Sequence, residues 1–293
     1  MQVIFGLDME TDVGSWTPFY EGLQHGTPRL LHTFAEQEIT GTFFFTGDAA
    51  RRYPGIVREV AAAGHEVGCH SLYHETVGAP LFDIPGIYPL LDHEVQPRLA
   101  LATEWVEQAL GEKVTSFRCP RLFGGTAVVN ALAALGYTAD ASYPMYFYRE
   151  RLAPYHPSPA DWTREGDSPV LEIPNFADMS IESHDPFGRD RDQWPLFRTE
   201  SADALMVHVD NFLAWLAARH VPPVLCFYFH PWEFWEMPQG AIHYGEGAVL
   251  PDKFLVENCG DYALAQFVRL IALLRERGAE FTTCRALAGL SEP

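Results

Sequence analysis

The sequence predicts an α/β protein whose strands form a distorted (β/α)7-type barrel. Short apolar runs recur along the chain, longer amphipathic stretches separate them, and turn residues such as Gly and Pro mark many of the boundaries. Alternation of strands and helices is typical of a parallel sheet with right-handed crossovers. Seven or eight such units favour a closed or nearly closed barrel, and the length of 293 residues fits a single domain over residues 1–293.

The first half of the chain supplies four predicted strands and four predicted helices. The strands are apolar runs rich in β-branched and aromatic residues, at residues 3–7, 40–45, 66–70 and 114–118. The helices are amphipathic stretches at residues 27–38, 51–64, 89–111 and 127–136. We expect Pro97 to kink the third helix, and Gly136 to end the fourth.

The second half continues the alternation but contains two long insertions. Strands are predicted at residues 137–142, 170–174, 224–230 and 280–284, and a helix is predicted at 261–278. Loop insertions are predicted at about 144–199 and 231–258, where Pro, Asp and aromatic residues are frequent. Loops of this length in a compact domain usually have a functional role or are mobile.

Composition excludes several classes of partner. The net charge of -19 argues against binding to nucleic acid or to anionic membranes, because both depend on Lys and Arg. The five cysteines include no C-x-x-C pair, which favours reduced thiols. No apolar run is long enough for a membrane span, and the N-terminus shows no signal-peptide pattern, so we expect a cytoplasmic protein. Its oligomeric state is left open.

Polar and charged side chains follow several predicted strands directly. They comprise Asp8, Glu10 and Asp12 after the first strand, His70 and His74 after the third, Arg118 after the fourth, then Asp140 and His230. The carboxyl ends of parallel barrel strands share one rim, where barrel enzymes hold their catalytic groups. We therefore expect these side chains to converge.

Two histidines and a carboxylate are a frequent ligand set for a catalytic divalent metal with open positions. His70 and His74 are four residues apart and would lie on the same face of a helical turn. Either Glu10 or Asp12 can supply the carboxylate, although Asp12 can also cap the segment that follows it. The H-x-x-x-H spacing alone is a weak signal, and its position after an apolar strand strengthens it.

The sequence resembles the polysaccharide deacetylase family, which has the NodB homology domain and is related to carbohydrate esterase family 4. HSLYH fits the family's H-[ST]-x-x-H motif, and LDMETD fits the Asp-x-Glu form of its first motif. GTFFFTG, AGHEVGCHS, FRCP and YFHP match further segments in the family's order. The resemblance implies a NodB-like barrel and a hydrolase acting on linear amide C–N bonds.

The resemblance also implies a role for each matched position. Asp8 corresponds to the general base, His230 to the general acid, and Arg118 to the residue that orients the base. Glu10, His70 and His74 correspond to the ligands of a divalent metal, with Zn²⁺ expected first and Co²⁺, Ni²⁺ or Fe²⁺ as alternatives. Asp140 corresponds to the acidic residue that tunes the histidine, and we group it with the substrate-binding residues.

Two further positions are candidates for substrate binding. Arg121 stands where the family usually has an aromatic residue after its Arg-x-Pro motif, and it would suit an anionic group on the substrate or equally a surface ion pair. Trp232 lies close after His230 and could stack on a sugar ring or belong to the core.

Three functions are compatible with these features. The first is a metal-dependent deacetylase or deformylase acting on an N-acylated amino sugar or on its nucleotide- or lipid-linked form. The second is a metal-free amidohydrolase of the allantoinase kind that acts on a small C–N substrate. The third is a catalytically inactive sugar-binding module. The intact set of Asp8, Glu10, His70 and His74 favours the first.

Overall fold

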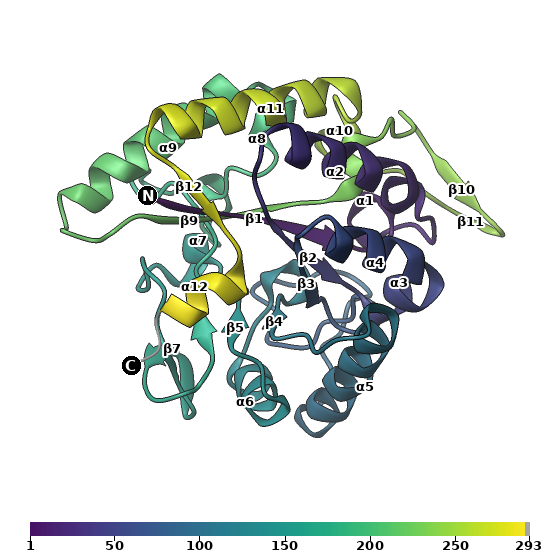
Figure 1. Cartoon of the computed structure of the whole chain (residues 1–293), viewed down its shortest axis with the longest axis horizontal. Helices are drawn as coiled ribbons and strands as arrows, with labels where there is room; N and C mark the ends of the chain where they lie inside the picture. The colour runs from purple at the N-terminus through teal and green to yellow at the C-terminus, as the bar shows by residue number, and fades with distance from the viewer. Residues whose placement is uncertain (291–293) are drawn as a thin grey trace.

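The computed structural model describes residues 1–290 as a curled parallel sheet with helices packed around its outer face (Figure 1). Eight strands form the sheet: β1 (Gln2–Met9), β2 (Thr42–Phe45), β3 (Glu66–Cys69), β4 (Ser116–Phe117), β5 (Ala139–Asp140), β8 (Leu171–Glu172), β9 (Val224–Phe229) and β12 (Glu280–Thr282). The predicted fold class, a distorted α/β barrel, is confirmed.

The order of pairing explains how the sheet curls. The strands run β12-β1-β2-β3-β4-β5-β8, and β9 also pairs with β1, all in parallel. An isolated parallel bridge between Asn175 and Cys226 joins the segment after β8 to β9. This bridge brings the two ends of the sheet together.

The longer helices cover the sheet. They are α2 (Thr27–Glu36), α3 (Gly47–Arg52), α4 (Pro54–Ala62), α5 (Asp92–Leu110), α6 (Thr126–Leu135), α9 (Ala202–Ala217), α11 (Asp261–Glu276) and α12 (Cys284–Leu290). The helix predicted at 51–64 is in fact the end of α3 followed by α4, where Pro54 fits the first helical position. Helix α5 continues through Pro97 as one helix. Helix α9 is absent from the prediction, although its buried residues follow a helical spacing.

One end of the barrel is closed by α12, the short yellow helix near β5 in Figure 1. Its first residue, Cys284, donates its backbone N–H to Thr42 Oγ1 at 3.1 Å, and the backbone N–H of Arg285 donates to Glu66 Oε2 at 3.0 Å. Thr42 and Glu66 begin β2 and β3, so α12 covers the amino ends of the strands. The carboxyl ends are left free to hold functional groups.

Much of the barrel interior next to that end is apolar. A cluster of buried side chains lies there, comprising Ile4, Phe44, Ala139, Ala141, Leu171, Ile173, Cys226, Cys284 and Leu287. On β1, Ile4 belongs to this cluster, while Val3, Phe5 and Leu7 belong to the larger core beneath the helices. Side chains of a strand alternate between its two faces, so Asp8, four residues after Ile4, shares the inward face.

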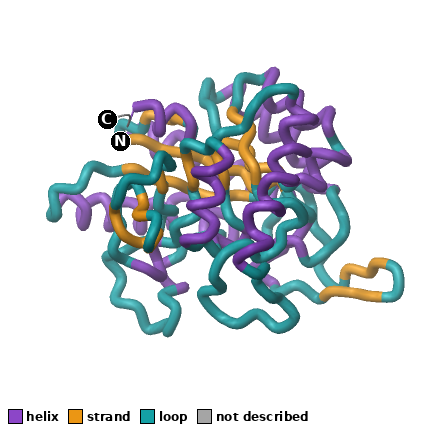
Figure 2. The backbone as a smooth tube through the Cα atoms, turned by 90° about the horizontal axis from the view of Figure 1, so that it is seen from below, coloured by secondary structure: helices purple, strands orange, loops and turns teal. Residues whose placement is uncertain are grey.

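The two insertions contain secondary structure of their own. Residues 144–199 include α7 (Met145–Tyr148), the β6 (Pro157–Ser158) and β7 (Asp161–Glu165) pair, η3 (Arg189–Arg191) and α8 (Leu196–Thr199), besides β8 of the main sheet. Residues 231–258 include η4 (Pro231–Phe234), α10 (Lys253–Val256), and a hairpin of β10 (Ile242–Tyr244) and β11 (Gly247–Val249). This hairpin projects from the body of the molecule (Figures 1 and 2). The remaining short elements are α1 (Asp12–Ser15), η1 (Gly22–Gly26) and η2 (Pro120–Leu122).

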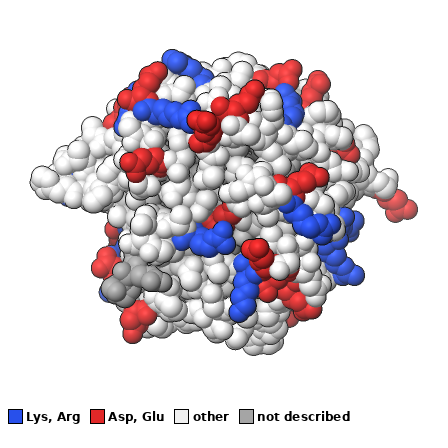
Figure 3. Space-filling model, viewed as in Figure 1, with Lys and Arg blue, Asp and Glu red and all other residues white. Residues whose placement is uncertain are grey.

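Acidic and basic side chains are interspersed on the face that Figure 3 shows. The negative net charge is therefore not gathered into a single patch on that face. Within residues 1–290, no helix is both long enough and apolar enough to cross a membrane.

Candidate active site

Five of the predicted residues meet at the carboxyl ends of the strands. Asp8 lies on β1 and Glu10 directly follows it, while His70, Arg118 and His230 directly follow β3, β4 and β9. All five side chains are buried. The fold thus brings these groups together as expected, because each one lies at or directly after the carboxyl end of a strand of the main sheet.

Arg118 passes through the barrel interior and contacts Asp8. Its Nη1 donates to Asp8 Oδ1 at 2.9 Å, its Nε donates to the Ala141 carbonyl oxygen at 3.0 Å, and its guanidinium lies over the Phe44 ring. Gly6 leaves room for this path, because a Cβ at that position would stand 2.1 Å from Arg118 Nη1. The carboxylate of Asp8 is thus held in one orientation by a buried charge.

Glu10, His70 and His74 form a compact cluster. One carboxylate oxygen of Glu10 lies 2.5 Å from His74 Nε2 and 3.5 Å from His70 Nε2. Each of the three residues offers one possible metal-ligand atom, and these atoms lie within 4.8 Å of one another. His70 Nδ1 lies 2.8 Å from the Arg118 carbonyl oxygen. Because a carbonyl oxygen only accepts, Nδ1 holds the proton and Nε2 keeps its lone pair for a ligand.

The turn that carries the two histidines is not helical, which corrects the prediction. Residues 70–75 form an irregular turn in which Ser71 and His74 both have a positive φ, of 65° and 61°. The Glu75 carboxylate accepts from the Tyr73 backbone N–H at 2.6 Å and from Ser71 Oγ at 3.2 Å. The two imidazoles are therefore brought together by left-handed backbone conformations, which Glu75 stabilises, and not by a helical turn.

Burial and charge set the protonation of the cluster. Burial favours the neutral form of Glu10, but His74 and His70 outweigh it and the pKa of Glu10 lies well below its usual range. Burial lowers the pKa of His74 to about 4. At neutral pH these two groups are an ionised carboxylate and a neutral imidazole, which are the forms that bind metal ions.

Asp12 is not part of the cluster. Its two carboxylate oxygens accept the backbone N–H groups of Glu21 and Gly22, each at 2.9 Å. Burial raises the pKa of Asp12 to about 6. Of the two carboxylates left open by the sequence, only Glu10 lies beside both histidines, and Asp12 has a structural role in holding residues 21–22.

His230 faces Glu10 from the opposite side and is oriented by Glu233. Its Nε2 lies 3.9 Å from Glu10 Oε1, and its Nδ1 and backbone N–H lie 3.0 and 2.9 Å from Glu233 Oε1. Glu233 also accepts from Arg198 Nε at 2.7 Å and from Trp194 Nε1 at 3.0 Å. Burial alone would lower the pKa of His230, but Glu233 and the nearby carboxylates raise it, so the protonated form becomes more accessible near neutral pH.

Two predicted residues have other positions, and their assignments are corrected. Asp140 is fully buried, accepts a hydrogen bond from Ser142 Oγ and lies beside Glu172. Trp232 is also fully buried, and its ring stacks on His230 with centroids 5.0 Å apart. Neither lines the cavity described next, so neither is placed to contact a substrate. The acidic partner of His230 is Glu233, three residues further along HPWE.

A cavity of about 380 Å³ opens directly over this group. Asp8, Glu10, His74 and His230 line its acidic part, together with the predicted Arg121. Its remaining wall is largely aromatic and aliphatic, and comes from Trp16, Phe82, Ile84, Leu122, Tyr146, Trp194, Tyr228, Phe254 and Leu255. Several of these residues belong to the two insertions. The frequency of aromatic residues in the insertions is the feature of the sequence that could have indicated this wall.

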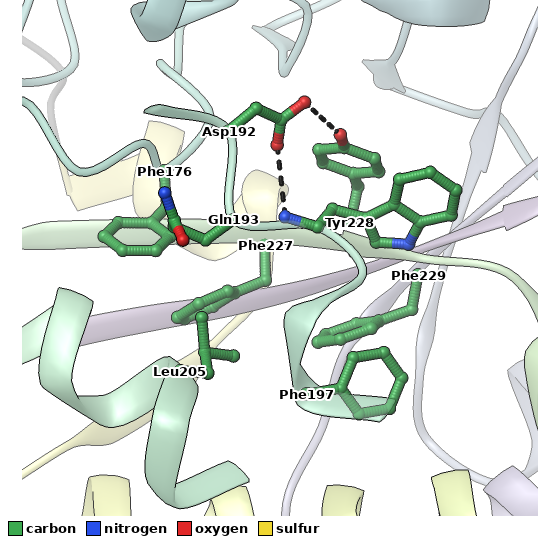
Figure 4. A pocket seen from close by; sticks show the side chains of 9 residues that line it. Phe176, Asp192, Gln193, Phe197, Leu205, Phe227, Tyr228 and Phe229 are labelled. Atoms are coloured by element: carbon green, nitrogen blue, oxygen red, sulfur yellow. Dashed lines mark hydrogen bonds between the residues drawn. The ribbon is translucent and has the colours of Figure 1, made fainter. Parts of the chain in front are cut away.

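The wall formed by Trp194 and Tyr228 is fixed from behind. The Asp192 carboxylate accepts from Tyr228 Oη at 2.7 Å (Figure 4) and from the Trp194 backbone N–H at 3.3 Å. The Trp194 and Tyr228 rings stack with centroids 5.6 Å apart. Phe197 and Phe229 pack below them, so this side of the cavity rests on the core (Figure 4).

Glu233→Gln is expected to lower the free energy of unfolding by about 3–5 kcal/mol, the usual result of breaking a buried ion pair. Both Arg198 and Glu233 are fully buried. A carboxamide must turn its NH2 group either toward Arg198 or toward the donors of His230 and Trp194, so one set of donors loses its acceptor. Chemical denaturation measures the change, with the exposed Glu236→Gln as the matched control. Equal stability of the two variants would contradict this role of Glu233.

The comparison with known proteins follows the same motifs. A family model described as polysaccharide deacetylase matches residues 13–139. Over these residues the chain is similar to the polysaccharide deacetylase family. The family resemblance inferred from the motifs is thereby confirmed, and the matched range contains His70, His74, Arg118 and Arg121.

Individual relatives and solved structures show similarity to the same kind of protein. A peptidoglycan-N-acetylmuramic acid deacetylase, PdaA of Bacillus subtilis, is 27% identical over 121 residues, which cover 41% of this chain and 42% of PdaA. A peptidoglycan-N-acetylglucosamine deacetylase of Bacillus cereus is 24% identical over 57% of this chain and 69% of its own length. The crystal structure of a probable polysaccharide deacetylase from Pseudomonas aeruginosa PAO1 has a TM-score of 0.65 at 15% identity, covering 98% of this chain and 89% of that one. The match thus spans less than half of PdaA, and the family fold extends over almost the whole of this chain.

Proposed function

We propose that this protein is a metal-dependent amide hydrolase that removes an acetyl or formyl group from an N-acylated amino sugar. One observation carries the proposal. Glu10, His70 and His74 form a metal-type cluster, with Asp8 and His230 beside it, and all of these except His70 line one cavity. A carboxylate-and-imidazole cluster next to two candidate proton-transfer groups is an arrangement suited to hydrolysis.

The residues present fit a divalent cation. Within the described chain, both carboxylate oxygens of Glu10 and Nε2 of His70 are buried without a well-formed hydrogen bond. Buried polar atoms normally have such partners, so their absence points to a ligand. Glu10, His70 and His74 would hold Zn²⁺, or Co²⁺, Ni²⁺ or Fe²⁺, and such an ion, when bound, lowers the pKa of water and polarises a carbonyl group.

Asp8 and His230 would carry the proton transfers. Asp8 keeps one oxygen on Arg118, while its Oδ2 lies 4.0 Å from His70 Nε2, on the side of the cluster. It is positioned to accept the proton of the attacking water as general base. His230 has its Nδ1 on Glu233 and directs Nε2 toward the cluster. That nitrogen is positioned to protonate the leaving amine, which departs poorly as an anion.

The relatives support the proposed substrate class. They are peptidoglycan and chitooligosaccharide deacetylases, which act on N-acetylated sugars. For this chain we propose an N-acylated amino sugar, either free or in a nucleotide- or lipid-linked form. The cavity, with its acidic floor and aromatic wall, has room for one such ring.

A panel of N-acetyl and N-formyl amino sugars tests the proposal. The protein, incubated with Zn²⁺ or Co²⁺, is expected to release acetate or formate from at least one of them, and prior treatment with a chelator is expected to abolish the release. Turnover that the chelator does not affect would instead favour a metal-free amidohydrolase. A protein that binds amino sugars but releases no acid with any metal would be an inactive binding module.

A further inference from the structure

We propose that the substrate carries an anionic group, a carboxylate or a phosphate, which Arg121 binds. This inference rests on the proposed function, because it concerns the same cavity, and it adds a chemical class to the amino sugar. It is carried by the position of Arg121, the absence of a salt bridge to its guanidinium within residues 1–290, and the composition of the surrounding wall.

Arg121 is fixed at the edge of the metal-type cluster. Its Nη1 donates to the carbonyl oxygen of His74 at 3.2 Å, and its guanidinium lies 5.9 Å from the centre of the Trp16 ring. Its backbone has a φ of 58°, a conformation that non-glycine residues rarely adopt. The side chain lines the cavity together with Glu10 and His74.

Arg121 forms no salt bridge within residues 1–290, and Glu10 is the carboxylate near enough to interact with its charge. Arg189, the other arginine on the cavity wall, differs: its Nη2 lies 3.7 Å from Asp192, and its guanidinium lies over Phe82 and Tyr146. A guanidinium has five N–H donors, and in the half-buried Arg121 only one of them has an acceptor among the described residues. The others are available to a ligand in the cavity.

An oxyanion suits this arrangement better than a neutral hydroxyl group. The planar guanidinium matches the geometry of carboxylate and phosphate oxygens and binds them through two parallel hydrogen bonds. Long-range electrostatic attraction does not assist the binding of an anionic ligand, because the net charge of -19 repels anions. A preference for an anionic ligand would therefore have to arise locally. The apolar wall of Trp16, Phe82 and Phe254 would contact the uncharged part of the ligand.

Binding of amine products tests this inference without requiring turnover. Glucosamine, glucosamine 1-phosphate, glucosamine 6-phosphate and muramic acid have the same ring, and the last three carry an anion at position 1, 6 or 3. Calorimetry on the metal-loaded protein is expected to show at least one anionic compound binding about 10- to 100-fold more tightly than glucosamine, the range for a hydrogen-bonded charge. Whether a phosphate or muramic acid binds best separates the two sources of the anion.

Arg121→Gln is expected to remove this preference, and Arg121→Lys to keep part of it. Arg219→Gln, which removes an exposed arginine just after α9, controls for the change in net charge and should leave the preference intact. Metal content measured on each variant shows whether the His74 turn is still intact. The inference is overturned if no anionic compound binds more tightly than glucosamine, or if the preference persists in Arg121→Gln. Neither result bears on the proposed function, which is tested separately by the release of acetate or formate.

Discussion

Asp8→Asn is expected to lower kcat for amide hydrolysis by about 10²–10⁴-fold, the usual contribution of a general base. The carboxamide has the same shape, and its oxygen can still accept from Arg118 Nη1, which lies 2.9 Å from Asp8 Oδ1. Its other end is an NH2 group, which cannot accept a proton from water. The fold and the metal-type cluster should therefore persist while the chemistry is lost.

The interpretation of that experiment depends on two controls. Asp203→Asn removes an exposed carboxylate that contacts Arg269 on the surface, and it should leave kcat unchanged. Metal content of Asp8→Asn should equal that of the wild type, because Glu10, His70 and His74 remain. If Asp8→Asn retains more than half of the wild-type kcat, Asp8 is not the general base.

Glu10→Gln and His70→Gln are each expected to abolish hydrolysis at a metal concentration that saturates the wild type. Glu10 supplies the only negative charge of the cluster, and His70 supplies a nitrogen whose lone pair is free because its Nδ1 lies on the Arg118 carbonyl oxygen. Loss of one of three protein ligands removes most of the affinity for a catalytic divalent ion. Assays across a metal titration measure the effect, and His32→Gln, at an exposed histidine, is the matched control.

A tenfold excess of metal that restores wild-type turnover to both variants would contradict the ligand assignment. Partial recovery confined to one variant would show instead that this residue is a weaker ligand than the other. The assay thus ranks the ligands as well as testing them.

Much of the site could be predicted from strand ends. Asp8, His70, Arg118 and His230 each end or directly follow an apolar run, and parallel strands bring such positions to one rim regardless of their separation in sequence. The two-residue alternation also separates Cys69, which lies in the outer core, from His70, which faces the site. Simple periodicity therefore locates the groups that chemistry requires.

The remaining features depend on contacts that no local pattern encodes. The choice of Glu233 over Asp140 as partner of His230 is decided by Arg198, a buried residue from a distant helix that stabilises Glu233. The histidine turn relies on left-handed backbone at Ser71, which a helical reading of the four-residue spacing cannot anticipate. Likewise, the cavity wall is assembled from insertions whose fold is set by tertiary packing.

The central claim is that Glu10, His70 and His74 bind a single divalent cation beside Asp8 and His230. Anomalous diffraction from crystals of the Zn²⁺-loaded protein, combined with metal analysis of the same sample, tests it most directly. The account predicts about one ion per chain, with its anomalous peak between Glu10 and the two imidazoles. An ion bound elsewhere, or a fully active protein that contains none, would contradict it.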